Sequence, residues 1–203
     1  MKTRFLATIC ISIVLSSMLN SCSSCSEEKR TSLGSEYGTT EEYFHEEDQN
    51  VRSYLPIFND VETVISTLSK NGIGKLGRWK NDMFGWISMT DYFILNEPST
   101  ADKMGNNIAY YLESNTEHCI EELKLVLNIN DTSEEQRAID FFKKTSKKTF
   151  ESLSLTIPDG LMNSISKGET YNNQQPEFTV AFEVTESNIS TYTLSISAET
   201  HQQ

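Results

Sequence analysis

Histidine is scarce in this chain of 203 residues, and its scarcity limits the catalytic chemistry that the sequence can support. Only His45, His118 and His201 are present. A Ser-His-Asp or Cys-His catalyst needs a histidine held rigidly beside a nucleophile. His45 lies in a polar N-terminal stretch and His201 lies close to the C-terminus, so His118 beside Cys119 is the one candidate pair. On a strand, adjacent side chains point to opposite faces and this pair could not meet.

Metal-binding and phosphate-binding motifs are also missing. No C-x-x-C occurs after residue 52, and no H-E-x-x-H occurs. Gly72, Gly74 and Gly77 lead into no predicted helix, and Gly74-Lys75 has no Ser or Thr after the lysine, so neither a dinucleotide-binding loop nor a P-loop is indicated. The stretch 128–131 does not continue into a calcium loop. We therefore predict no cofactor and no metal site.

Basic residues are few relative to acidic ones. Lysine and arginine number 17 against 29 aspartates and glutamates, which gives a formal net charge of −12. This sign repels phosphate backbones, so we predict that the chain does not bind nucleic acid. An acidic surface favours a cationic partner, and it is also a simple route to solubility. Both interpretations stay open.

Residues 1–21 have the three-part build of a secretory signal. Lys2 and Arg4 come first, an apolar stretch follows over residues 5–19, and small or polar residues precede a cysteine. The apolar stretch of about 15 residues spans roughly 22 Å as a helix, short of the roughly 30 Å hydrocarbon core of a bilayer. We predict a signal that is removed rather than a spanning helix.

The end of this signal reads Leu19, Asn20, Ser21, Cys22 and resembles the lipobox of bacterial lipoproteins. The resemblance covers about 22 residues and carries no information on the fold. It implies cleavage between Ser21 and Cys22, followed by acylation of Cys22 with chains such as palmitate. Two or more acyl chains give a stable hold on a bilayer. The implied partner of this segment is a membrane.

The residues after Cys22 bear on the membrane address. Ser23 stands where lipoproteins retained at the inner membrane carry an aspartate, so the resemblance implies the outer membrane. Glu27 and Glu28 look similar to the export signals of some surface-exposed lipoproteins. Whether the domain faces the periplasm or the cell surface stays open.

Residues 22–52 are predicted to be an acidic, flexible tether. The stretch is rich in Ser, Thr, Gly and acidic residues, and such a composition cannot bury enough apolar surface to offset the entropy of ordering. Four ring-bearing residues interrupt it, and they either dock on a partner or merely touch the domain: Tyr37, Tyr43, Phe44 and His45. An oxidising compartment would permit a disulfide between Cys25 and Cys119 without requiring one.

Residues 53–203 are predicted to form a single α+β domain, because about 150 residues suit one hydrophobic core. The 3.6-residue period predicts helices over residues 59–70, 133–152 and 159–168. Asn59 or Asp60 can cap the first helix, and Asp159 the third. Ser133 and Gln136 have the spacing of a capping box for the second.

Alternating apolar residues predict the strands. One or two strands are expected in residues 83–95, and one each in 108–112, 123–129, 178–185 and 192–196. Residues 117–125 could instead form a short helix, and residues 169–176 are expected to be a polar loop. Strands before and after a helical block, with no βαβ alternation, favour an antiparallel sheet of about five strands with helices packed on one face.

Two sets of side chains have a functional and a structural interpretation. The aromatic residues Trp79, Trp86, Tyr92, Tyr110 and Tyr111 could line a ligand groove, or they could pack in the core and across strands. The lysines Lys143, Lys144, Lys147 and Lys148 could meet a membrane or an anion, or form a solvated face that complements the helix dipole.

These observations favour a noncatalytic binding or interaction domain held at the outer membrane by its lipid. In one version it is an immunity-type or envelope-partner lipoprotein that blocks a cationic protein. The alternative is a hydrolase of envelope polymers with paired carboxylates such as Asp91 and Glu113. That alternative requires a cleft with two carboxylates about 5 to 9.5 Å apart.

Overall fold

The computed structural model describes residues 51–98 and 104–202. The predicted signal, its cleavage site at Ser21 and the lipid-bearing Cys22 therefore lie outside the described residues, as does nearly all of the tether. The first described strand, β1, begins at Val51, two residues before the predicted start of the domain. Among the described helices, none is long and apolar enough to cross a membrane.

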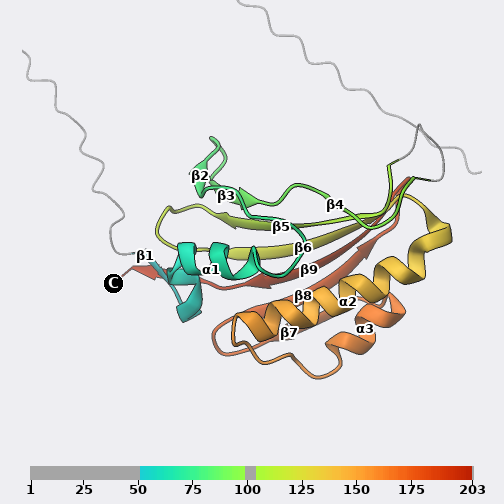
Figure 1. Ribbon diagram of the computed structural model, residues 1–203. Helices are drawn as coiled ribbons and strands as arrows, with labels where there is room; N and C mark the ends of the chain where they lie inside the picture. The colour runs from blue at the N-terminus through green and yellow to red at the C-terminus, as the bar shows by residue number, and fades with distance from the viewer. Residues whose placement is uncertain (1–50, 99–103, 203) are drawn as a thin grey trace, which may run out of the picture. The chain divides into compact units, whose positions relative to one another are not determined.

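A large antiparallel sheet dominates the domain (Figure 1). Its eight strands run in the order β2-β3-β5-β6-β9-β8-β7, and β4 also pairs with β5. The bounds are β2 Lys80–Asn81, β3 Trp86–Met89, β4 Phe93–Ile94, β5 Asn107–Ser114, β6 Glu122–Ile129, β7 Tyr171–Gln174, β8 Thr179–Thr185 and β9 Ser190–Ser197. The mixed helix-and-sheet class is confirmed, but the expected number of about five strands is wrong.

The additional strands are short or uniformly polar. β3 and β4 both fall within residues 83–95, where one or two strands were predicted. β2 has only two residues, too few to show an alternating pattern. β7 has the sequence YNNQ and occupies part of the predicted loop 169–176, so that loop prediction is wrong. The predicted helix over residues 117–125 is also absent from the described chain, because β6 begins at Glu122 and the residues before it form a connection.

A separate two-stranded ribbon closes the domain at its ends. β1 (Val51–Ser53) pairs antiparallel with β10 (Thr200–Gln202), and Val51 lies opposite Gln202. The backbone N–H of Tyr54 extends this pairing by donating to the carbonyl of Glu199 at 3.0 Å. The first described residues and the last ones are therefore fastened to each other.

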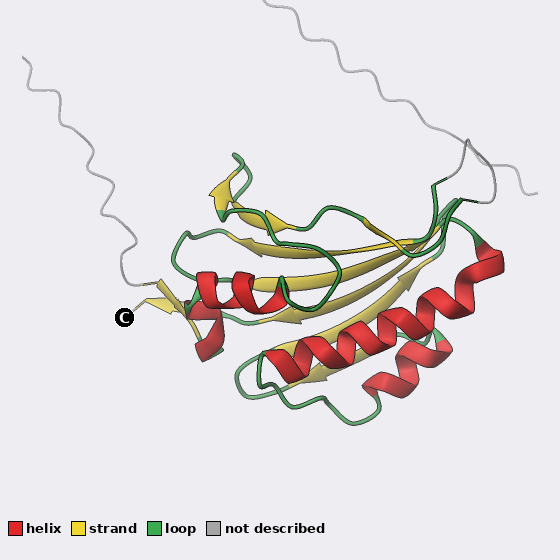
Figure 2. Cartoon of the chain, in the orientation of Figure 1, coloured by secondary structure: helices red, strands yellow, loops and turns green. Residues whose placement is uncertain are grey.

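Three α-helices cover the sheet (Figure 2). They are α1 (Val61–Leu68), α2 (Glu135–Ser152) and α3 (Leu161–Lys167), with 3-10 turns η1 (Pro56–Asn59) and η2 (Thr132–Glu134) leading into the first two. The carboxylate of Asp60 caps α1 by accepting the backbone N–H of Thr63 at 3.0 Å. Of the two predicted caps for this helix, Asn59 and Asp60, the structure uses Asp60.

The predicted caps of the other two helices are wrong. The Ser133–Gln136 capping box does not form, because Asp131 accepts both the N–H and the hydroxyl of Ser133 while Gln136 bonds Asp140. Gly160, in a left-handed conformation, stands at the N-cap of α3 in place of Asp159.

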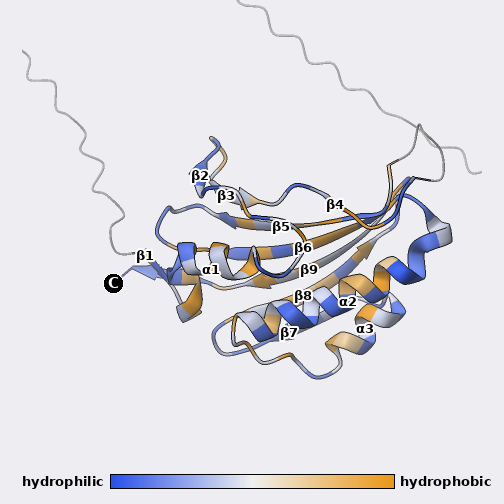
Figure 3. Ribbon diagram, in the orientation of Figure 1, coloured by the Kyte–Doolittle hydropathy of each residue, from blue (hydrophilic) through white to orange (hydrophobic). Residues whose placement is uncertain are grey.

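The two faces of the sheet differ in character. Along β6, four apolar residues are buried in the core: Leu123, Leu125, Leu127 and Ile129. All three helices contribute to the same core, through residues such as Leu68, Phe142 and Leu161. The alternate residues of β6, such as Lys124 and Asn128, lie on the opposite face and are half-buried. Figure 3 shows hydrophobic and hydrophilic residues side by side along α2, as an amphipathic helix requires.

Candidate functional site

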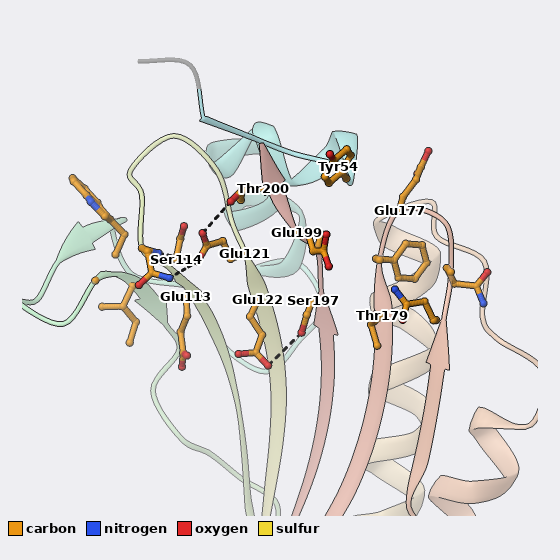
Figure 4. A pocket seen from close by; sticks show the side chains of 18 of the residues that line it. Tyr54, Glu113, Ser114, Glu121, Glu122, Glu177, Thr179, Ser197, Glu199 and Thr200 are labelled. Atoms are coloured by element: carbon orange, nitrogen blue, oxygen red, sulfur yellow. Dashed lines mark hydrogen bonds between the residues drawn. The ribbon is translucent and has the colours of Figure 1, made fainter. Parts of the chain in front are cut away.

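A depression of about 810 Å³ lies at one end of the sheet (Figure 4). Its floor comes from the ends of β5, β6 and β9, where Glu113, Glu122 and Ser197 are consecutive neighbours in the strand register. One wall is the turn between β2 and β3, and the other is the turn between β7 and β8, which includes Glu177. The depression is therefore a trough between two hairpins.

All the charged side chains among the described residues that line this trough are carboxylates. Six acidic residues line it: Asp82, Glu113, Glu121, Glu122, Glu177 and Glu199. Among the described lining residues there is no lysine, arginine or histidine. We call this depression the acidic groove. Its field attracts cations and repels anions.

Four of the six carboxylates are engaged within the domain. Asp82 accepts the backbone N–H of Phe84 at 3.1 Å. Glu121 accepts the backbone N–H and the side-chain amide of Asn115, at 3.0 and 2.8 Å, and the hydroxyl of Thr200 at 3.5 Å. Glu113 and Glu122 share the ammonium of Lys124, at 2.7 and 3.0 Å. These contacts hold the floor in place.

Lys124 lies on the open face of the sheet beside the groove. Its partial burial acts to lower the pKa of the ammonium, but hydrogen bonds and the charges of Glu113 and Glu122 outweigh that effect, so the pKa is raised. The lysine therefore stays charged and neutralises part of the floor.

Two other carboxylates are available to a ligand. Glu177 and Glu199 are exposed, and no described residue forms a hydrogen bond or an ion pair with either side chain. Both are labelled in Figure 4, on the side of the groove formed by β9 and the β7–β8 turn. A cation that enters the groove would meet these two groups without displacing an internal contact.

Aromatic rings stand among the carboxylates. Tyr54, Phe84, Trp86 and Phe178 all line the groove. The ring of Tyr54 lies against that of His201, with centroids 4.5 Å apart and the ring planes tilted by 33°, and its side of the groove also carries Glu199. Carboxylates and ring faces together suit guanidinium or ammonium groups, which bind to both.

The predicted aromatic cluster is divided by the structure. Of its five members, only Trp86 lines the groove. Tyr110 is fully buried, and its hydroxyl bonds Thr149 and Asn71 inside the core. The hydroxyls of Tyr92 and Tyr111 lie 3.4 Å apart. The packing interpretation therefore holds for Tyr110.

The predicted pair Asp91 and Glu113 is not gathered in the groove, because Glu113 lines it and Asp91 does not. Glu113 instead shares the ammonium of Lys124 with Glu122. The structure therefore does not bring the two predicted carboxylates together in this groove.

The candidate pair His118 and Cys119 lies in the connection between β5 and β6, not on a strand. Cys119 is fully buried. Burial, followed by the charge of Glu121, raises the pKa of its thiol to about 11, despite the opposing effects of Arg52 and Ser53. A buried neutral thiol is a poor nucleophile. Cys25 lies outside the described residues, and a disulfide between it and Cys119 would require this part of the core to open.

The lysines of α2 are partly used within the domain. Lys148 donates to the carbonyls of Lys70 and Asn71, at 3.3 and 3.0 Å, just after α1. Lys143 contacts the hydroxyl of Ser166, and Lys147 pairs with Glu151 at 3.6 Å. Two of these lysines therefore join α2 to neighbouring elements.

No family model, curated protein or solved structure matches this chain. Among the residues of the described segments, no group of three His, Cys, Asp or Glu side chains is arranged to hold a metal ion.

Sequence reasoning did not identify Tyr54, Glu177 and Glu199 as neighbours. They come from the segment after β1, the β7–β8 turn and the connection between β9 and β10. The acidic composition was the one signal in the sequence that pointed toward them.

Proposed function

We propose that this protein is a noncatalytic binding domain, displayed from the outer membrane by lipid on Cys22, that binds a cationic segment of another envelope protein in the acidic groove. An immunity-type lipoprotein, which occupies and blocks a cationic protein, is one version of this function. The observation that carries the proposal is the pair of unengaged carboxylates, Glu177 and Glu199, in a groove whose described lining has no cation.

The chemistry of the groove favours reversible binding. Glu177 and Glu199 are exposed, so water and salt screen their attraction for a ligand. The aromatic rings of Tyr54 and Phe178 add contact area that is less sensitive to salt. We therefore expect association to be fast and strongly salt-dependent.

A titration with a defined probe tests the groove. A fluorescent deca-arginine peptide is added to the protein at low and high salt, and a deca-citrulline peptide serves as the neutral probe. The double variant Glu177→Gln/Glu199→Gln should bind deca-arginine at least about tenfold more weakly, as expected when two charge contacts are lost.

The matched control is Glu183→Gln/Glu186→Gln, which removes the same charge outside the groove. Equal weakening in both double variants would show that net charge alone attracts the peptide and would refute the groove. Affinity capture from solubilised envelope at low salt should also recover a stoichiometric partner with the wild-type protein and lose it with the groove variant. Recovery of no such partner would count against the proposal.

The anchor has its own test. Mass spectrometry of the mature protein should find an N-terminal Cys22 that carries a diacylglyceryl group and an amide-linked acyl chain. An unmodified Cys22, or a different N-terminus, would remove the lipid anchor from the proposal and leave the groove untouched.

A further inference from the structure

The turn between β2 and β3 holds two apolar side chains in solvent. Met83 and Phe84 are 90% and 91% exposed, the highest values among the large hydrophobic residues of the described segments. The turn is well defined: Asn81 accepts the N–H of Met83 at 2.9 Å, Asp82 accepts that of Phe84 at 3.1 Å, and the N–H of Asp82 donates to the carbonyl of Gly85 at 3.0 Å. The turn therefore holds Met83 and Phe84 exposed to solvent, and we call this pair the apolar tip.

Both tryptophans of the chain lie close behind the apolar tip. Trp79 directly precedes β2 and Trp86 begins β3, and their rings stack with centroids 6.2 Å apart. The indole N–H of Trp79 donates to the carbonyl of Glu117 at 3.0 Å, which fixes the ring. Tryptophan favours the boundary between hydrocarbon and lipid headgroups because its ring is both apolar and polar.

The segment that leads to the tip is cationic in an acidic protein. Residues 63–81 contain Lys70, Lys75, Arg78 and Lys80 and no acidic residue, although the net charge of the chain is −12. Lys75, Arg78 and Lys80 are exposed, and none forms an ion pair with another described residue. Cations placed beside exposed apolar residues complement the phosphates of a lipid surface.

We infer that the apolar tip is a membrane contact. Met83 and Phe84 enter the acyl boundary of a lipid surface, the two indoles lie at the headgroups, and Lys75, Arg78 and Lys80 meet lipid phosphates. A protein partner fits less well, because two residues on a projecting turn offer little of the flat or concave area that a stable interface buries. Figure 1 shows this hairpin projecting from the edge of the sheet.

The contact goes beyond the proposed function because it orients the domain. Phe84 is part of one wall of the acidic groove, so insertion of the tip would hold that wall at the lipid surface. Asp82 and the other groove carboxylates repel an anionic bilayer. Burial of the apolar tip therefore supplies the larger share of the attraction between the domain and the bilayer. The expected dependence on anionic lipid is therefore moderate.

The chain carries its own probe of this contact, since Trp79 and Trp86 are its only tryptophans. The full chain is reconstituted in phosphatidylcholine vesicles with and without one-third phosphatidylglycerol, and with ordinary or brominated acyl chains. No groove ligand is added. Brominated chains should quench tryptophan emission at least about twofold, as expected for indoles at the headgroups immediately above the acyl chains, and phosphatidylglycerol should increase the quenching.

Neutral substitutions separate tip insertion from mere proximity to the vesicle. Met83→Ser/Phe84→Ser should abolish most of the quenching, whereas Ile189→Ser should preserve it, because Ile189 is a 42% exposed apolar residue in the β8–β9 turn. Arg78→Gln/Lys80→Gln should remove the effect of phosphatidylglycerol. Absence of quenching in the wild-type chain, or full quenching in the tip variant, would overturn the inference. A tip variant that loses a protein partner without any lipid effect would assign the tip to protein binding instead.

Discussion

Tyr110 places a hydroxyl inside the core, and its partners explain why polar residues occur on the buried side of α2. The hydroxyl lies 2.5 Å from that of Thr149 and accepts the side-chain amide of Asn71 at 3.1 Å. Thr149 donates its own proton to the carbonyl of Thr145, so it must accept the proton of Tyr110. All the polar groups of this small network are therefore satisfied.

This proton arrangement predicts unequal effects of two near-isosteric substitutions. Thr149→Val leaves the Tyr110 proton without an acceptor and should lower the free energy of unfolding by about 2 kcal/mol. Tyr110→Phe should cost nearer 1 kcal/mol, because Asn71 keeps its bond to Ser152 at 3.1 Å and Thr149 keeps its bond to Thr145. Urea denaturation measures both, and a larger loss for Tyr110→Phe would contradict the proton assignment.

The buried thiol of Cys119 predicts a dependence of stability on pH. Its pKa is about 11 in the folded chain against an ordinary value of 9.0. A raised folded pKa gives stability that is complete below pH 9 and is lost as pH rises toward 11, because the unfolded thiol ionises first. Between pH 8.5 and 11 the wild type should lose about 2 kcal/mol more than Cys119→Val. Equal losses would show that the thiol does not contribute.

At the scale of single elements, the close packing of the β2–β3 hairpin against β5 requires a glycine at position 85. Gly85 has φ of +149°, and a Cβ there would lie 2.6 Å from the carbonyl oxygen of Ser114 on β5. This close approach lets the hairpin pack directly against β5. The hairpin forms one wall of the acidic groove. A side chain at this position would push the two strands apart.

Gly85→Ala should therefore lower the free energy of unfolding by about 1 to 3 kcal/mol, since it combines a steric clash with backbone strain. Gly77→Ala is the matched control, because its Cβ would lie at an ordinary 3.5 Å from the carbonyl of Met89. That control should change stability by less than about 0.5 kcal/mol. Thermal unfolding followed by tryptophan emission compares them, and equal shifts would argue against this close packing.

At the scale of the whole molecule, the ribbon of β1 and β10 joins the start of the described chain to its end. The residues that follow β1 and precede β10, Tyr54 and Glu199, line the acidic groove. The core itself does not need β10, because its last member is Ala198. The ribbon thus positions one side of the groove.

Removal of residues 200–203 should leave the sheet folded but release β1. Hydrogen exchange should accelerate at Arg52, which lies opposite the removed His201, while the amides of β5 and β6 should keep their protection. Binding of the deca-arginine probe should weaken, because Tyr54 and Glu199 lose their mutual support. Removal of Gln203 alone is the control and should change none of these. Loss of protection throughout β5 and β6 would show that the ribbon supports the core.

Much of the fold could be predicted because the information is local. The alternation of β6 and the apolar stripe of α2, including Ile139 and Phe142, lie within single segments. β2 and β7 could not be found this way, since two residues, or a single tyrosine followed by amides, carry no period. Likewise, nothing local distinguished Asp131 from Ser133 as the cap before α2.

By itself, the sequence determined the mixed class, the principal strands and helices, and the acidic balance of the chain. Each of these follows from composition or from a period that a segment shows alone. Only the tertiary structure decided that Glu113, Glu122 and Ser197 lie in one row, and that Tyr54, Glu177 and Glu199 line the same groove. Strand register and turn placement are set by packing between distant segments, so the groove exists only in the folded chain.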